Sequence, residues 1–303
     1  MLDSLKRNDT LKLAQDSRYW LLALAGGLML FHLALTDQTG DMKGFSISLI
    51  FWGAIASMVW DKKETLKFRT TLSASLFATT LLILAFWKIL QISSGGIFVQ
   101  AVPLIFGLSL ALIASSWRGL GQYRKELMSF AVLALPGERF LAGNLESLIQ
   151  NITGYSFTML TAAASTFGLS LVGMKPLLTD GVYINLSRSI VRVHEGCSGA
   201  GIIDFLLRLS FLFLIVFSTT RLGKWLAPVI AIALGFIVNS FRVAVMAYLI
   251  NDFNTETFDY WHVGSGSQIF GAIGVILFGL ICFPFIKSES AQAAAEPPSE
   301  HGT

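Results

Sequence analysis

Charged residues and cysteines are both scarce in this chain of 303 residues. Asp, Glu, Lys and Arg together make up 14% of it, whereas hydrophobic residues make up 54%. So few charges cannot cover the surface of a water-soluble domain, and the composition therefore predicts a membrane protein. Two cysteines exclude a framework of several disulfides. The sequence also lacks a phosphate-binding loop and a cluster of His, Cys, Asp and Glu at metal-ligand spacing, so we expect no metal, no cofactor and no nucleic-acid partner.

Long apolar runs are abundant instead. A run of about 20 apolar residues can cross the lipid bilayer as a helix. We predict an all-α polytopic membrane protein with about eight transmembrane helices in a single membrane domain, residues 1–287. The predicted spans are 19–36, 44–60, 70–90, 97–117, 126–136, 199–218, 225–250 and 266–286. Residues 288–303 are rich in Ala, Glu and Pro, which predicts a disordered cytoplasmic tail.

The apolar segment 155–173 is ambiguous because it is rich in Thr, Ser and Ala. We predict an amphipathic or re-entrant segment at the outer face rather than a crossing. With a cytoplasmic N-terminus, fourteen Lys and Arg residues then lie inside and six outside, as the positive-inside rule favours. If the segment did cross, the loop 221–224 and the end at Lys287 would move outside and the bias would weaken. We therefore expect both termini in the cytoplasm.

The segment Glu195-Gly196-Cys197-Ser198-Gly199-Ala200-Gly201 sets a cysteine among small residues where an apolar helix begins. Unpaired N–H groups and the helix dipole at a helix N-terminus favour the thiolate, which is the nucleophilic form of cysteine. Neighbouring glycines let a substrate backbone approach the sulfur. The alternative is that Cys197 is a small buried hydrophobic residue at a helix start.

Two further polar residues fall at the depth of Cys197 in the predicted topology. Arg242 lies in the outer half of the seventh span, and His262 lies in the outer loop before the eighth. A charge within a span usually faces a partner or a polar cavity, and histidine can exchange a proton near neutral pH. Alternatively, Arg242 reaches up to the headgroups and His262 belongs to an aromatic interfacial belt. His194 competes with His262 as the base that a cysteine nucleophile requires.

Asp204 and Arg208 lie four residues apart in the sixth predicted span. This spacing predicts an ion pair within one helix, which reduces the cost of burying either charge. We interpret the pair as structural. The second cysteine, Cys282, falls near the inner end of the last span and is interpreted as a packing residue.

A short hairpin is predicted just before the cysteine. Two runs rich in β-branched residues, 181–186 and 189–194, are separated by Ser187-Arg188. The second run leads directly into the cysteine turn, and its edge could bind an extended peptide by strand addition. A plain connecting loop is the alternative interpretation.

These motifs resemble those of the exosortase/archaeosortase family, and most of all its cyanobacterial branch, the cyanoexosortases. The resemblance rests on Val193-His194-Glu195-Gly196-Cys197-Ser198-Gly199, on Asn239-Ser240-Phe241-Arg242-Val243, and on His262 within the segment 258–267. It covers roughly residues 126–284, whereas the first four spans match only as generic apolar helices.

The resemblance implies a cysteine protease or transpeptidase embedded in a bacterial plasma membrane, with its active site on the extracytoplasmic face. Its substrates would be exported proteins that carry a C-terminal sorting signal: a Pro-Glu-Pro-type motif, a transmembrane helix and a basic cluster. A cysteine thioester would pass to water or to an acceptor nucleophile whose identity the sequence does not give. The implied catalytic residues are Cys197, Arg242 and His262, and the implied substrate-binding or supporting residues are Ser198, Gly199, Asn239, His194 and Trp261.

Two rival classes use the same residues differently. A membrane transporter or channel would line a substrate path with Arg242, Asp204 and Arg208. A non-catalytic protein of exopolysaccharide assembly would leave Cys197 unreactive.

Overall fold

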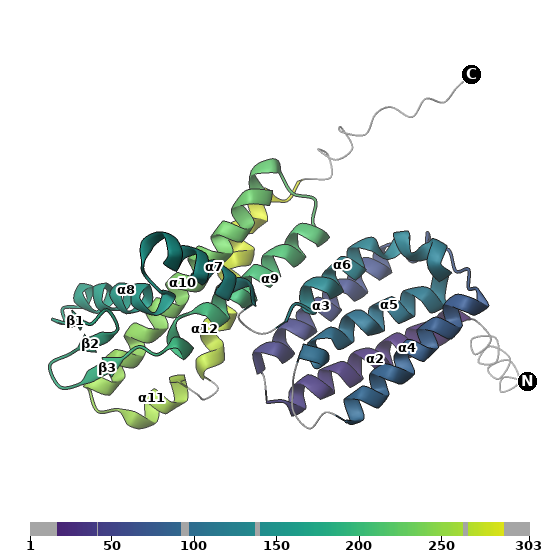
Figure 1. Ribbon diagram of the computed structural model, residues 1–303. Helices are drawn as coiled ribbons and strands as arrows, with labels where there is room; N and C mark the ends of the chain where they lie inside the picture. The colour runs from purple at the N-terminus through teal and green to yellow at the C-terminus, as the bar shows by residue number, and fades with distance from the viewer. Residues whose placement is uncertain (1–16, 41, 92–96, 137–139, 263–265, 288–303) are drawn as a thin grey trace, which may run out of the picture. The chain divides into compact units, whose positions relative to one another are not determined.

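A computed structural model describes residues 17–40, 42–91, 97–136, 140–262 and 266–287 (Figure 1). The chain divides into two compact units, unit 1 (Met1–Gly137) and unit 2 (Glu138–Thr303). Seven helices among the described residues are long and apolar enough to cross a membrane. The prediction of a polytopic, helical membrane protein is therefore confirmed. The single membrane domain over 1–287 and the cytoplasmic termini stay predictions, and the tail 288–303 lies outside the described residues.

Unit 1 is a helical bundle in which α5 packs against α2, α4 and α6, while α3 packs against α2 and α6. Its core includes the fully buried Phe106 and Val102 of α5, with Leu28 of α2 and Ala85 of α4. The described elements of unit 1 are α2 (Ser17–Gln38), α3 (Met42–Asp61), α4 (Leu72–Leu90), α5 (Ile97–Gly119), the 3-10 turn η1 (Leu120–Tyr123) and α6 (Arg124–Leu133).

The chain reverses direction between α5 and α6. A Cβ built on Gly107 of α5 would lie 2.3 Å from the ring of Phe130 on α6, although a straight helix would separate residues 23 positions apart by about 35 Å. Ser116, with φ of 59°, makes the break. The two spans predicted over 97–117 and 126–136 therefore correspond to two helices that run in opposite directions, α5 and α6. α6 has ten residues and is about 15 Å long, too short alone for the bilayer core.

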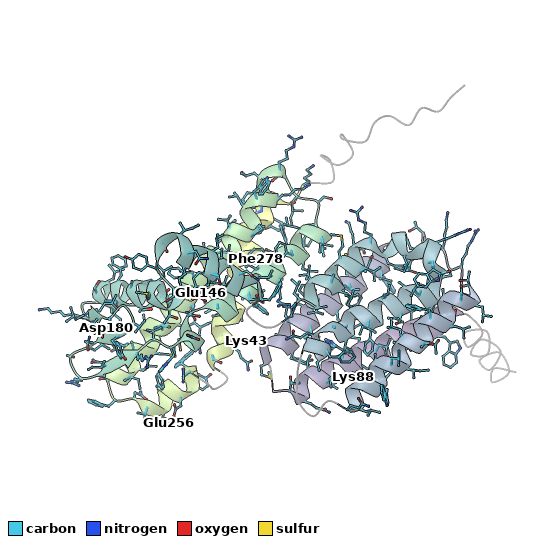
Figure 2. All side chains as sticks on the ribbon, in the orientation of Figure 1. Lys43, Lys88, Glu146, Asp180, Glu256 and Phe278 are labelled. Atoms are coloured by element: carbon cyan, nitrogen blue, oxygen red, sulfur yellow. The ribbon has the colours of Figure 1, made fainter. Side chains whose placement is uncertain are left out.

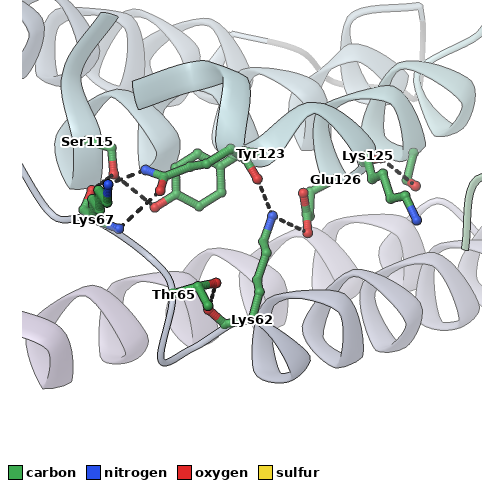
Figure 3. A network of polar contacts seen from close by, with 9 residues as sticks. Lys62, Thr65, Lys67, Ser115, Tyr123, Lys125 and Glu126 are labelled. Carbon is green, nitrogen blue, oxygen red and sulfur yellow. Dashed lines mark hydrogen bonds and ion pairs between the residues drawn. The ribbon is translucent and has the colours of Figure 1, made fainter. Parts of the chain in front are cut away.

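A polar network ties this reversal to the loop between α3 and α4 (Figure 3). Lys62 Nζ lies 2.7 Å from the Glu126 carboxylate and also donates to the carbonyl of Gln122. Ser115 Oγ donates to the carbonyl of Lys67 and lies 3.1 Å from the Tyr123 hydroxyl. Two basic loops that the predicted topology places on one membrane side thus lie at the same end of unit 1.

Unit 2 surrounds one long helix, α10, which packs against α8, α9, α11 and α12. A Cβ on Gly235 of α10 would lie 2.9 Å from Cα of Ile203 on α9, so these two backbones approach as closely as a glycine allows. The described helices of unit 2 are α7 (Phe140–Thr153), α8 (Phe157–Leu171), α9 (Ala200–Val216), α10 (Arg221–Asn251), α11 (Thr255–His262) and α12 (Gly266–Cys282), with 3-10 turns η2 (Glu195–Cys197) and η3 (Phe283–Phe285).

The predicted ion pair on α9 is confirmed, and it also holds a neighbouring helix. Arg208 Nε lies 2.7 Å from Asp204 Oδ2, and both side chains are buried. Asp204 Oδ1 accepts hydrogen bonds from the N–H groups of Leu141 and Ala142 at the start of α7. A carboxylate in this position satisfies N–H groups that have no partner within their own helix.

Unit 2 uses a second carboxylate in the same way. Glu146 of α7 (Figure 2) accepts a hydrogen bond, 2.9 Å long, from the N–H of Phe157 at the start of α8.

An aromatic contact joins α9 and α12 in the core of the unit. It involves Phe278 of α12, which is also labelled in Figure 2. The Phe278 ring packs edge-on against Phe213 of α9, with ring centres 5.9 Å apart, in the core of the unit. The side chains of α7, α8, α9 and α12 thereby fix the helices around α10.

The predicted hairpin is present and forms part of a three-stranded antiparallel sheet, β1-β2-β3 (Figure 1). One face of the sheet, including Ile184, Val191 and Val193, packs against α8 and α10. Because the two runs alternate apolar and polar residues, they predicted β2 and β3 but gave no sign of the third strand. The strands are β1 (Leu177–Thr179), β2 (Tyr183–Asn185) and β3 (Ile190–Arg192).

The ambiguous segment 155–173 contains α8, which has 15 residues. A helix of this length spans about 22 Å, less than the bilayer core of about 30 Å. Its apolar face packs along α10 and the sheet. Whether it lies at the membrane surface or dips into the bilayer stays a prediction.

Candidate active site

Cys197 is the last residue of η2, three residues before α9 begins. The predicted cysteine turn at a helix start is thus present. Gly199 makes the turn with φ of 90°, and a Cβ there would lie 2.9 Å from the Asn239 side chain. Gly199 therefore serves the turn both by its left-handed backbone and by its lack of a side chain. Ser198 is buried, and its Oγ accepts from the N–H of Ala200 at 3.4 Å.

Two side chains from other helices hold the carbonyls of this turn. Asn239 Nδ2 on α10 donates to the carbonyl of Cys197 at 2.8 Å, and Thr161 Oγ1 on α8 donates to the carbonyl of Ser198 at 2.9 Å. Both side chains are buried. Asn239 was predicted as a supporting residue, whereas Thr161 was missed. The backbone around the sulfur is consequently fixed from two sides.

The missed residue did leave a signal in the sequence. Thr161 and Ser165 are four residues apart on α8 and so lie on one helix face. Ser165 Oγ donates to the carbonyl of Ser240 on α10 at 2.9 Å. The Ser and Thr residues that made segment 155–173 ambiguous are, at these two positions, hydrogen-bond donors to the cysteine turn and to α10.

The two cysteines differ in accessibility. Cys197 is partly exposed, whereas Cys282 of α12 is fully buried. Cys282 lies in the apolar core with residues of α9 and α10, as predicted for a packing residue. A reagent in solution can therefore reach the thiol of Cys197 but meets Cys282 only when the core opens.

Arg242 lies on α10 one turn beyond Asn239, and it links the cysteine turn to α11. Its Nη2 donates to the backbone carbonyl of His262 at 2.9 Å, and its charge interacts with that of Cys197. Its Nε is buried and has no hydrogen-bond partner among the described residues. The guanidinium thus has one donor that no described group engages.

His262 is the last residue of α11, and its ring stacks on that of Phe258 with centres 5.0 Å apart. Burial lowers the pKa of His262 below its ordinary value, the positive charges of Arg242 and His194 lower it further, and Asp259 opposes this. The imidazole is therefore neutral at pH 7 and can accept a proton.

His194 and Trp261 occupy different surroundings. His194 is exposed, its carbonyl accepts from the N–H of Cys197 at 2.8 Å, and its charge acts on His262. Both histidines thus lie near the cysteine turn. Trp261 packs edge-on against Tyr260 and Phe270, so its ring contacts join α11 to α12.

Three residues that are remote in the sequence therefore meet in unit 2. Cys197 comes from η2, Arg242 from α10 and His262 from α11; α10 binds the carbonyl of Cys197 through Asn239 and the carbonyl of His262 through Arg242, one turn further on. Across the described ranges, no group of three or more His, Cys, Asp or Glu residues could hold a metal ion.

The chain also matches the model of a known protein family. The family model described as transmembrane exosortase matches residues 38–279. The chain belongs to the transmembrane exosortase family. The family comprises membrane peptidases and transpeptidases, which gives this exosortase its general class. No curated protein and no solved structure matches the chain significantly.

The family match is wider than the sequence motifs indicated. It begins at residue 38, whereas the motifs that carry the resemblance begin near residue 126. Most of the described part of unit 1 in this exosortase is thus part of the family's pattern, not only a set of generic apolar helices. Membership of the cyanobacterial branch stays a prediction.

Proposed function

We propose that this exosortase is a cysteine-dependent membrane peptidase or transpeptidase that cleaves the C-terminal sorting signal of exported proteins. The signal would comprise a Pro-Glu-Pro-type motif, a transmembrane helix and a basic cluster. The observation that carries the proposal is the position of Arg242, which lies one helical turn beyond Asn239, the residue that binds the carbonyl of Cys197, and which donates to the carbonyl of His262. The site would face the extracytoplasmic side of a bacterial plasma membrane, in contact with the lipid bilayer.

The reaction begins at the sulfur. The thiol proton of Cys197 passes to a neutral imidazole, and the thiolate attacks the carbonyl carbon of the scissile peptide bond. Arg242 stabilises the negative charge that develops on the carbonyl oxygen, because a fixed positive charge is most effective where water is excluded. The C–N bond then breaks, the imidazolium returns its proton to the leaving amine, and a thioester remains on Cys197.

Water or an acceptor amine completes the cycle. It attacks the thioester carbonyl, loses a proton to the imidazole, and forms a carboxylic acid or a new amide while the C–S bond breaks. The departing sulfur recovers its proton. Asn239 and Thr161 hold the carbonyls of Cys197 and Ser198, so the turn that carries the sulfur keeps its shape through both steps.

The described contacts disfavour a transporter or channel as the alternative. Asp204 and Arg208 bind each other, and Asp204 also accepts from two N–H groups of α7. Buried groups engaged in this way do not line an open path. Arg242, in contrast, has no carboxylate partner among the described residues, and its Nε has no hydrogen-bond partner there.

The test uses a reporter protein whose C-terminus carries Pro-Glu-Pro, an apolar helix of about 20 residues and a cluster of Lys and Arg. In membranes that contain the full-length wild-type chain, the reporter should be cleaved. Cys197→Ala should lower the rate by several orders of magnitude, whereas the matched variant Cys282→Ala should leave it nearly unchanged. Iodoacetamide should label Cys197 before Cys282. Normal processing of the reporter by Cys197→Ala would falsify the proposal.

A further inference from the structure

The outer edge of β3 has backbone groups free to bind another strand. Leu186 N–H donates to the carbonyl of Ser189, and Val193 N–H donates to the carbonyl of Val182. In an antiparallel pair, residues alternate between facing the partner strand and facing away. Ile190 and Arg192 therefore direct their N–H and C=O groups away from β2, and no described residue hydrogen-bonds to these groups.

This edge is also little protected. Ile190 is 68% exposed, and the strand contains neither proline nor a bulge. Natural proteins usually block such edges, because an open edge is a template for a further strand. The opposite edge differs, since β1 follows Pro176, which has no N–H to donate.

The chain runs from the edge strand β3 directly to the turn that carries the thiol of Cys197. Val193 is still hydrogen-bonded to β2, and after His194 the chain enters η2, which ends at Cys197. Four residues thus separate Arg192 from Cys197, and the turn between them is closed by the hydrogen bond from the N–H of Cys197 to the carbonyl of His194. A peptide bound along β3 is held beside the entrance to the sulfur.

The charge of the edge selects an acidic peptide. The segment 186–194 contains two arginines and one histidine but no acidic residue. Arg192 is exposed and its guanidinium lies 5.7 Å from the centre of the Tyr183 ring on β2, which holds it over the solvent face of the sheet. A carboxylate side chain directly opposite Arg192 on an added strand would form a favourable cross-strand pair.

We propose that an extended, acidic segment of the substrate adds to β3 as a fourth, antiparallel strand and is thereby presented to Cys197. This inference rests on the proposed peptidase function and names how its substrate is held. Backbone hydrogen bonds to Ile190 and Arg192 supply affinity, and the carboxylate facing Arg192 sets the register.

The N–H groups of successive residues in a strand point in opposite directions, and this explains how a strand that contains prolines can add to β3. In an added antiparallel strand, only every second residue directs its N–H toward β3. A Pro-Glu-Pro segment with Glu opposite Arg192 places both prolines at the alternate positions, where no N–H to β3 is needed. The Glu side chain then lies on the same face as Arg192. A shift by one residue would place a proline where a donor is required.

A charge exchange tests the pairing with the reporter described above. Arg192→Glu should lower cleavage about fivefold, because an attractive cross-strand pair becomes repulsive. A reporter with Pro-Lys-Pro should be cleaved poorly by the wild-type chain but restored to within about twofold by Arg192→Glu. The matched control is Arg188→Glu, which makes the same charge change in the hairpin turn, where the backbone is held by Asn251.

A backbone variant tests the edge itself. Ile190→Pro removes one outward N–H and leaves the hydrogen bonds to β2 in place. It should lower cleavage at least about tenfold, while iodoacetamide labels Cys197 at the wild-type rate. If the labelling rate changes as well, Ile190→Pro has disturbed the cysteine turn. The charge exchange between Arg192→Glu and the Pro-Lys-Pro reporter then decides whether the substrate adds to β3.

The outcomes separate this inference from the proposed function. Absence of cleavage by the wild-type chain would overturn the peptidase proposal. Cleavage by the wild-type chain that is unaffected by both Ile190→Pro and Arg192→Glu would overturn strand addition alone. So would a loss in Arg192→Glu that Pro-Lys-Pro does not rescue, or an equal loss in Arg188→Glu.

Discussion

Both units hold buried or half-buried charged side chains, but these have different partners in the two units. In unit 1, Lys62 and Glu126 neutralise each other, and Lys62 also binds the carbonyl of Gln122. These contacts join two loops at one end of the bundle. In unit 2, Arg242 donates to the backbone carbonyl of His262, and its Nε has no partner among the described residues. The Lys62–Glu126 pair stabilises the fold of unit 1, whereas Arg242 can still bind an anionic group.

Unit 2 contains the same contrast within itself. Asp204 and Arg208 bind each other and Asp204 caps α7, yet Arg242 in the same unit binds only a backbone carbonyl among the described residues and leaves its Nε without a partner. A buried charge with a carboxylate partner indicates structure, and one without such a partner indicates a site. Glu126 Oε2 also has no described hydrogen-bond partner, but Lys62 already neutralises that carboxylate.

The largest effect on stability should come from breaking the structural pair of unit 2. Asp204→Ala should lower the free energy of unfolding by about 3 kcal/mol, because it leaves Arg208 as a buried cation and removes the cap of α7. The measurement is chemical unfolding of the full-length chain in detergent. The exposed Asp252 offers a matched control, since Asp252→Ala should change stability by less than about 0.5 kcal/mol. Equal stability of the two variants would contradict the structural role of Asp204.

The complementary variant should affect activity and not stability. Arg242→Gln should lower kcat/KM for reporter cleavage by about 10²–10³-fold, the usual loss when one group that stabilises a transition-state charge is removed. Its unfolding should remain close to that of the wild type. In unit 1, Lys62→Gln should do the reverse: it should lower stability by about 1 kcal/mol and leave cleavage unchanged. A similar loss of cleavage in both variants would remove the distinction between the units.

Much of this arrangement was accessible from the sequence because it depends on local patterns. Apolar runs predicted the spans, alternation predicted β2 and β3, and the small residues around Cys197 predicted its turn. Asn239 was placed beside the site by its motif with Arg242. Each of these inferences uses the residues of a single segment, or of several segments that the predicted topology places at the same depth in the membrane.

The remaining features arise from contacts between segments. The basic segment between the two predicted spans indicated a reversal after residue 117, but not the close packing of Gly107 against Phe130. Thr161 binds a carbonyl 37 residues away, so its role follows from how α8 packs and not from its neighbours. The free edge of β3 likewise became visible only with the register of the sheet.

The smallest expected effect is the shift of the pH profile in His194→Gln, and it separates the two histidines. Because burial and the charge of Arg242 lower the pKa of His262, its neutral form persists below pH 6.5, and the acid limb of kcat/KM should lie below that value. His194→Gln removes one positive neighbour, so it should keep this limb and move it slightly upward. His262→Gln should abolish the limb and most of the activity. If the limb disappears in His194→Gln instead, His194 is the base, and the stacked position of His262 on Phe258 serves to hold Arg242.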